Sequence, residues 1–116
     1  MKEFNIYKYY DLTCYSNNVL NVVYKDVQSL NDPFDINVTY GGRGDSRSFH
    51  LSELLVPEFT DNINWICWLH DKIYNLIENK IDGYTKEFAD SLFYELLKAE
   101  DFPLAYVYYL AVVEFG

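Results

Sequence analysis

The chain has 116 residues, half of them hydrophobic and 19% aromatic, with 12 Tyr and 8 Phe. This length and composition predict one domain with a real core, and they exclude an intrinsically disordered chain. The formal net charge of −9 opposes binding to phosphate backbones, so we expect no nucleic-acid partner. Two cysteines, Cys14 and Cys67, are too few for a disulfide scaffold or a structural zinc site.

The N-terminal residues MKEFNIYKYYD lack the apolar stretch of a signal peptide, so we expect no secretion by that route. The longest apolar segment, LAYVYYLAVV, has ten residues, whereas a membrane-spanning helix needs roughly 20. We therefore expect no membrane insertion.

The first sixty residues predict strands and turns. EFNIYKYY and VLNVVYKDV are rich in aromatic or β-branched residues, and INVTY (36–40) alternates strictly, with Ile36, Val38 and Tyr40 on one face. SNN (16–18) and NDPFD (31–35) have turn chemistry. GGRGDSRS (41–48) is expected to be a loop, and the segment up to Pro57 a short strand or turn.

After Thr60 the hydrophobic period becomes helical. A first helix is expected from Asn62 to about Lys80, and Thr85 is the expected N-cap of a second. A third helix is expected to begin at Asp101 or Phe102 and to continue to the C-terminus. Together these patterns predict an α+β fold in a single domain, residues 1–116, with a small N-terminal antiparallel β-sheet followed by three helices.

WLHDKIYN (68–75) places His70 and Asp71 in an apolar run. If the first two helices are antiparallel, His70 can meet Asp90, and a histidine held by a carboxylate is a general-base arrangement. Asp71 points elsewhere and could take an oxygen-preferring cation such as calcium. The alternative is that His70 and Asp90 form a clasp between helices, or face solvent.

The last helix, AYVYYLAVVEF, is apolar almost all round, so either the core or a partner covers it. Tyrosine has an apolar ring and a polar tip, which suits protein interfaces. The candidate interface residues are Tyr106, Tyr108 and Tyr109.

Four short segments, in order, carry a resemblance over about sixty residues. They are VPEFTD (56–61), HDKIY (70–74), TKEFADSLF (85–93) and the tyrosine-rich stretch to Gly116. In this order they resemble an uncharacterised phage-associated domain family of unknown function. The resemblance implies a phage or prophage origin and an α+β fold, without an established activity. The chain departs from the family pattern at Glu58, where the family has glycine, and at Lys86, where it has arginine.

The HDxxY helix followed by a helix bearing Asp is also similar to the helix pair of phospholipases A2. This resemblance implies that His70 is the general base, that Asp71 binds calcium, and that Asp90 orients His70 with support from Tyr74. The glycine loop and paired cysteines do not match that family's pattern.

The departures from both patterns favour a non-enzymatic role. We expect a small viral protein that contacts other phage or host proteins, as a head or tail accessory of the virion or an assembly component. Its expected location is the virion or the host cytoplasm. Two alternatives remain open: a phospholipase A2-like or other hydrolase that uses His70 and Asp90, and an acidic inhibitor of a host defence enzyme.

Overall fold

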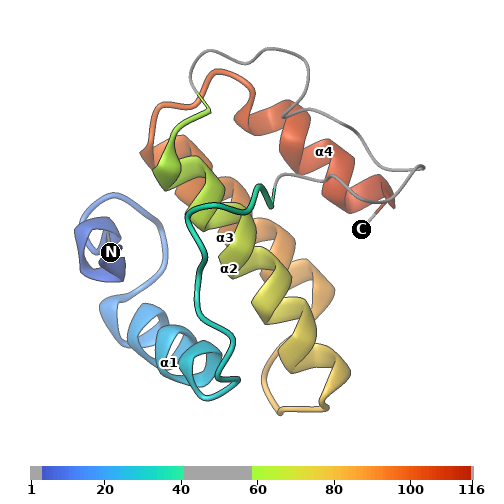
Figure 1. The fold of residues 1–116 in the computed structure, drawn as a ribbon. Coiled ribbons are helices and arrows are strands. Elements are labelled where there is room, and N and C mark those ends of the chain that lie inside the picture. Colours follow the sequence, from blue (N-terminus) through green and yellow to red (C-terminus); the bar gives the residue numbers. More distant parts are fainter. Residues whose placement is uncertain (1–3, 41–58, 116) are drawn as a thin grey trace.

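The computed structural model describes residues 4–40 and 59–115, and all regular structure in these ranges is helical (Figure 1). A 3₁₀ helix, η1 (Ile6–Tyr9), precedes α1 (Asn17–Gln28). After an irregular segment come α2 (Asp61–Glu78), α3 (Lys86–Ala99) and α4 (Ala105–Phe115). The α2 and α3 helices form the centre, with α1 and η1 on one side and α4 packed against α3.

The predicted N-terminal antiparallel sheet is wrong, because the described residues contain no strand. The segment expected as a β-branched strand is α1 instead. Its apolar residues Leu20, Val23 and Val27 are buried, and their spacing of three and four places them on one side of a helix. The Ser16 side chain accepts a hydrogen bond from the Val19 amide and caps the helix.

The alternating segment INVTY does not pair with another strand. Ile36 and Val38 are 37% and 42% exposed, and the Val38 amide closes a turn onto the Asp35 carbonyl. The buried side-chain amide of Asn64 on α2 accepts from the Tyr40 amide at 2.7 Å and donates to the Val38 carbonyl at 2.7 Å. Asn64 thus supplies the backbone partners that a neighbouring strand would otherwise provide. The segments expected at residues 41–58 lie outside the described residues.

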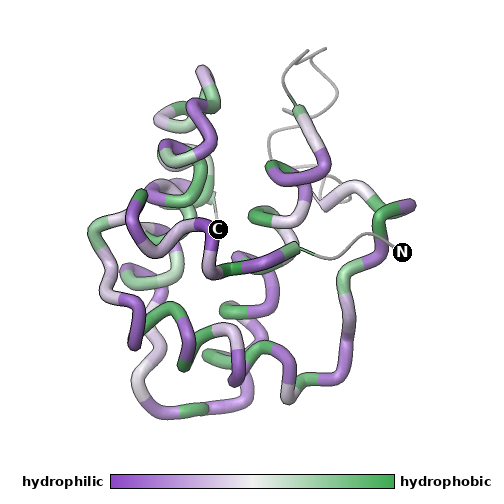
Figure 2. Tube along the Cα trace, turned by 90° about the vertical axis from the view of Figure 1, so that its left-hand side faces the viewer, coloured by the Kyte–Doolittle hydropathy of each residue, from purple (hydrophilic) through white to green (hydrophobic). Residues whose placement is uncertain are grey.

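The α2 helix is the centre of the core. Eleven of its residues are buried, from Ile63 to Leu76. Trp65 is 2% exposed, and its ring lies against the rings of Phe4, Tyr9, Tyr24 and Trp68. Hydrophilic and hydrophobic residues alternate along much of the trace (Figure 2). Buried apolar residues of η1, α1, α2, α3 and α4 form one shared core.

Capping side chains and residues with positive φ define the ends of α2 and α3. Thr60 and Thr85 cap α2 and α3, the latter as expected from the sequence. Lys80 and Asp101 follow the C-terminal ends of these helices with positive φ values of 60° and 56°, which turns the chain back sharply. The last helix begins at Ala105, later than expected, because residues 101–104 form this turn.

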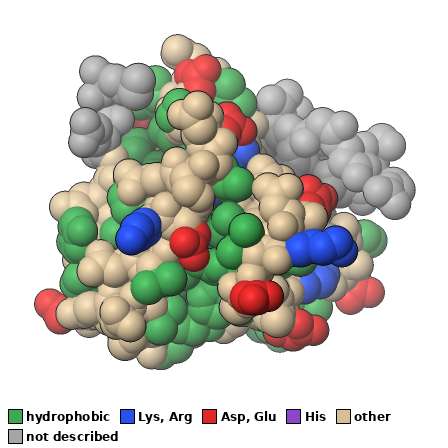
Figure 3. All heavy atoms as spheres, turned by 90° about the horizontal axis from the view of Figure 1, so that it is seen from below, with side chains coloured by type: hydrophobic (Ala, Val, Ile, Leu, Met, Phe, Trp, Pro, Cys, Tyr) green, Lys and Arg blue, Asp and Glu red, His purple; other side chains and the backbone are tan. Residues whose placement is uncertain are grey.

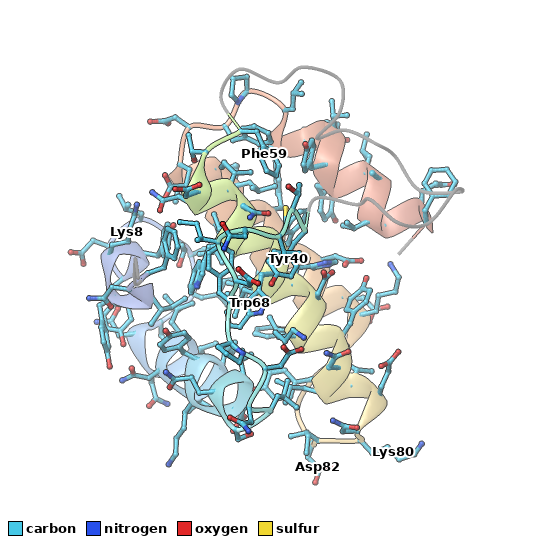
Figure 4. The ribbon with its side chains drawn as sticks, viewed as in Figure 1. Lys8, Tyr40, Phe59, Trp68, Lys80 and Asp82 are labelled. Atoms are coloured by element: carbon cyan, nitrogen blue, oxygen red, sulfur yellow. The ribbon has the colours of Figure 1, made fainter. Side chains whose placement is uncertain are left out.

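The end of the molecule that carries α1 and the α2–α3 turn has apolar side chains interspersed with charges of both signs (Figure 3). Lys80 and Asp82 mark the tip of that turn, and Phe59 lies at the opposite end of the molecule (Figure 4). Among the described residues, no helix has both the length and the apolarity that crossing a membrane requires.

Candidate functional site: the Asp90 network

The structure brings His70 and Asp90 together across the α2–α3 interface. His70 Nε2 and Asp90 Oδ1 are 2.7 Å apart. The two residues are only 6% and 3% exposed. A carboxylate only accepts hydrogen bonds, so the His70 Nε2–H is the donor.

Two more side chains donate to the same carboxylate. The Tyr74 hydroxyl, one turn after His70 on α2, donates to Asp90 Oδ1 at 2.6 Å. The Lys86 ammonium, one turn before Asp90 on α3, donates to Oδ2 at 2.7 Å. We call these four residues the Asp90 network. Both helices contribute residues at i and i+4, which lie on one side of a helix, so the two faces meet at a single carboxylate.

Lys86 extends the network to the third helix. Its ammonium also donates to the carbonyls of Val112 at 3.1 Å and Val113 at 3.2 Å. The last carbonyls of a helix lack partners within the helix, and they carry the negative end of its dipole. The Lys86 ammonium therefore donates hydrogen bonds both to the last carbonyls of α4 and to the buried Asp90 carboxylate of α3.

The network keeps Asp90 ionised. Burial alone would raise the pKa of Asp90, but the hydrogen bonds from His70, Lys86 and Tyr74 outweigh burial and hold that pKa below its ordinary value. Burial, together with the hydrogen bond to Asp90, raises the pKa of the Tyr74 hydroxyl, which therefore stays a donor. The carboxylate charge is thus compensated inside the protein, as a buried charge requires.

The His70 ring is closely packed. Its centroid is 4.5 Å from the ring of Tyr74 and 4.5 Å from the ring of Phe93. Two hollows of about 370 Å³ and 320 Å³ lie elsewhere, one beside Trp65 and Trp68 and the other between α1 and the α2–α3 turn. Neither hollow is lined by a residue of the Asp90 network. The arrangement of the described residues is that of a clasp between packed helices.

Asp71 lies on the exposed side of α2 and makes no hydrogen bond to the described residues. Calcium takes about six to eight oxygen ligands. Residues 4–40 and 59–115 contain no group of three or more His, Cys, Asp or Glu side chains placed to hold a metal ion. Asp71 alone does not fit a calcium site within this part of the chain, and calcium binding remains a prediction.

The three candidate interface tyrosines lie in different environments. Tyr106 is 57% exposed and Tyr109 is partly buried, whereas Tyr108 is 3% exposed and packs edge-on against Phe102. Tyr106 and Tyr109 both contact the ring of Tyr94 on α3. The structure thus places Tyr106 and Tyr109 at the surface of α4, and Tyr108 in the core.

Sequence reasoning missed two charged residues that organise the fold. Lys86 departs from the family pattern, but its i, i+4 spacing to Asp90 predicts the observed ion pair. Glu100, at the end of α3, accepts from the Tyr9 hydroxyl at 2.5 Å and pairs with Lys8 at 2.7 Å. No local signal connects Glu100 with η1, because Tyr9 lies 91 residues away in the chain.

Comparison of the chain with protein-family models, with curated proteins and with solved structures found no match.

The Asp90→Asn substitution tests the network through acid stability. A carboxyl with a lowered folded pKa stabilises the protein above its unfolded pKa of about 3.9, and this contribution is lost as the pH falls through the folded pKa. We expect the free energy of unfolding of Asp90→Asn to be lower by about 3 kcal/mol at neutral pH. We also expect it to change less than that of the wild type between about pH 7 and pH 2, with the difference arising below about pH 5.

Denaturant unfolding followed by circular dichroism across this pH range measures both effects. Asp11→Asn is the control, because it removes an exposed carboxylate outside the Asp90 network and should leave both the stability and its pH dependence close to those of the wild type. An Asp90→Asn variant with wild-type stability and an unchanged pH dependence would contradict this account of the network.

Proposed function

We propose that the chain acts through protein–protein contacts made by an exposed apolar face of α4. Tyr106, Val107, Leu110 and Val113 form this surface, which we call the α4 face, and each is between 42% and 57% exposed. Their spacing follows one side of a helix. Contiguous apolar surface of this kind marks interaction sites in soluble proteins.

The charge distribution supports this proposal. Between Phe102 and Phe115 the only charged residue is Glu114, in a chain whose net charge is −9. Centres of protein interfaces are depleted of charge and enriched in aromatic residues. The Tyr94, Tyr106 and Tyr109 rings contact one another along the edge of the α4 face. An aromatic helix whose one charged residue is Glu114, on an acidic protein, therefore has the composition of a contact surface.

The Asp90 network has a positioning role in this proposal. Lys86 fixes the C-terminal end of α4, while Tyr108 and Ala105 anchor its inner side in the core. These contacts hold α4 against the core and leave the α4 face directed outward. A preorganised surface loses less conformational freedom on binding.

The sequence resemblance to a phage-associated domain family supports the proposal that these contacts are made in a phage. The partners would be other phage or host proteins, and the chain would be a virion head or tail accessory or an assembly component. It would work in the virion or the host cytoplasm. The support for a phage setting is the order of the segments VPEFTD (56–61), HDKIY (70–74) and TKEFADSLF (85–93) and the tyrosine-rich stretch to Gly116.

A photo-crosslinking amino acid at position 110 tests the proposed contact. In cells that assemble the phage particles, we expect position 110 to give a discrete adduct, because Leu110 lies in the middle of the α4 face. The same amino acid at position 81 is the control, since Ile81 is equally apolar and 43% exposed but lies on the α2–α3 turn.

The adduct at position 110 should disappear when Val107→Glu is added, because a buried carboxylate is costly in an apolar contact. Mass spectrometry of the adduct identifies the partner. Equal adducts from positions 110 and 81, or an adduct that survives Val107→Glu, would rule out the α4 face as the contact surface.

A hydrolase is the second candidate, and the 2.7 Å contact between His70 Nε2 and Asp90 favours it. With Nε2 held by Asp90, the ring's other nitrogen, Nδ1, would take a proton from water as a general base. Asp90 would orient the ring and Tyr74 would hold Asp90. The substrate class would be lipids or other esters, as the similarity to the phospholipase A2 helix pair implies.

His70→Gln separates the two candidates, because the glutamine amide can still donate toward Asp90 but cannot act as a base. If the chain is a hydrolase, the purified wild type hydrolyses phospholipid vesicles or a nitrophenyl ester, with or without calcium. His70→Gln would then lose this activity with an unchanged circular dichroism spectrum. If the chain acts only through protein contacts, neither protein turns over substrate. Turnover that requires His70 would therefore show that the Asp90 network is catalytic and does not serve only to position α4.

A further inference from the structure

The α4 face is nearly free of charge on a strongly acidic protein. Two copies of this chain, each with net charge −9, repel each other wherever their acidic surfaces approach. A surface that carries almost no charge lets two copies approach each other with the least repulsion. The α4 face meets this condition, because Glu114 is the only charged residue between Phe102 and Phe115.

We propose, resting on the proposed function of the α4 face, that the partner of this face is a second copy of the same chain. The two α4 helices would pack antiparallel across a two-fold axis near Leu110. A two-fold interface uses the same surface on both copies, so this surface must complement itself. Leu110 is the central residue of the stripe, with Tyr106 on one side and Val113 on the other, so antiparallel pairing places a large side chain opposite a small one.

The charges at the ends of α4 also favour the antiparallel arrangement. Glu114 is exposed in the last turn of α4. Lys98 of α3 lies over the Tyr94 ring, with its ammonium 4.6 Å from the centroid, and Tyr94 contacts Tyr106 at the first turn of α4. Antiparallel pairing brings Glu114 of one copy toward Lys98 and the positive end of the α4 dipole of the other. Parallel pairing would place the two Glu114 carboxylates side by side.

Lys98 is available for this contact, although it already has one acidic neighbour. Its ammonium is 3.2 Å from Glu95 of the same helix, and its side chain is 47% exposed. An exposed ion pair of this kind contributes little energy, so Lys98 can share its charge with a second carboxylate. The charged groups near the N-terminal end of α4 are Glu95, Lys98 and the exposed Asp101. At the C-terminal end they are Glu114 and Lys86, and the Lys86 ammonium is already held by Asp90 and the Val112 and Val113 carbonyls.

The size of the surface determines how strong the dimer is. A helix of 11 residues is about 16 Å long, and a pair of such helices buries less than the roughly 1,200 Å² of a stable interface. We therefore expect a reversible dimer with a dissociation constant in the micromolar range or weaker, rather than a permanent one.

Sedimentation velocity of the purified chain, from roughly 5 to 500 µM, tests this inference in a range that suits a weak interface. We expect the wild type to shift from monomer to dimer as concentration rises and Val107→Glu to remain monomeric. Val22→Glu is the matched control: Val22 is 48% exposed on α1, away from α4, and Val107 is 42% exposed. Val22→Glu should dimerise like the wild type. A wild type that stays monomeric throughout, or equal loss in both variants, would overturn the inference.

A charge exchange tests the antiparallel arrangement. Glu114→Lys alone should weaken dimerisation, and combining it with Lys98→Glu should restore it. Failure of the double variant to recover dimerisation would contradict antiparallel pairing. If the purified chain stays monomeric while position 110 still crosslinks to a different protein in cells, this inference fails and the proposed function stands.

Discussion

The arrangement of the helices depends on one buried carboxylate. Asp90 is 3% exposed and ionised, which is unfavourable in a protein interior unless the charge is fully compensated. The compensation comes from three side chains, two on α2 and one on α3, so the carboxylate can be satisfied only when these helices lie in one register. Apolar contacts alone hold helices together less selectively, because many registers bury similar areas. The Asp90 network thus favours the observed register of α2 and α3.

Lys86 carries this constraint to the surface of the molecule. Because its ammonium binds Asp90 and the last carbonyls of α4 together, the position of α4 is tied to the α2–α3 interface. The inner side of α4 is buried at Ala105 and Tyr108, and its outer side is exposed at Leu110 and its neighbours. Glu100 has a parallel role at the other end of α3, where it fixes η1 through Tyr9 and Lys8. Buried or half-buried acids therefore place the peripheral elements around the central helix pair.

The second half of the chain could be predicted from the sequence, because its signals are local. Thr85 begins α3, as expected, and the apolar stripe of α2 faces the core. The meeting of His70 and Asp90 also follows from two antiparallel helices joined by a short turn. The contact between Lys86 and the end of α4 could not be predicted from the sequence, because no local pattern shows that the last carbonyls of α4 lie near the Lys86 ammonium.

The first half shows why residue type can mislead. Valines at positions 19, 22, 23 and 27 favour a strand by propensity, but the spacing of the buried residues Leu20, Val23 and Val27 fits a helix. The alternation of INVTY is present without a neighbouring strand. Its backbone is satisfied at Val38 and Tyr40 by Asn64, which lies 24 residues after Tyr40 in the sequence. A sheet is a property of paired segments, so one alternating segment does not establish one.

The most direct measurement of the central claim is amide hydrogen exchange in a Lys86→Met variant, with Lys80→Met as an exposed control. Lys86→Met removes the ammonium that joins Asp90 to the Val112 and Val113 carbonyls and leaves the His70 and Tyr74 hydrogen bonds in place. We expect the amides of α4 to exchange faster in Lys86→Met, while α2 and α3 retain more of their protection and Lys80→Met matches the wild type. Wild-type protection of α4 in Lys86→Met would show that the Asp90 network does not hold α4 in place.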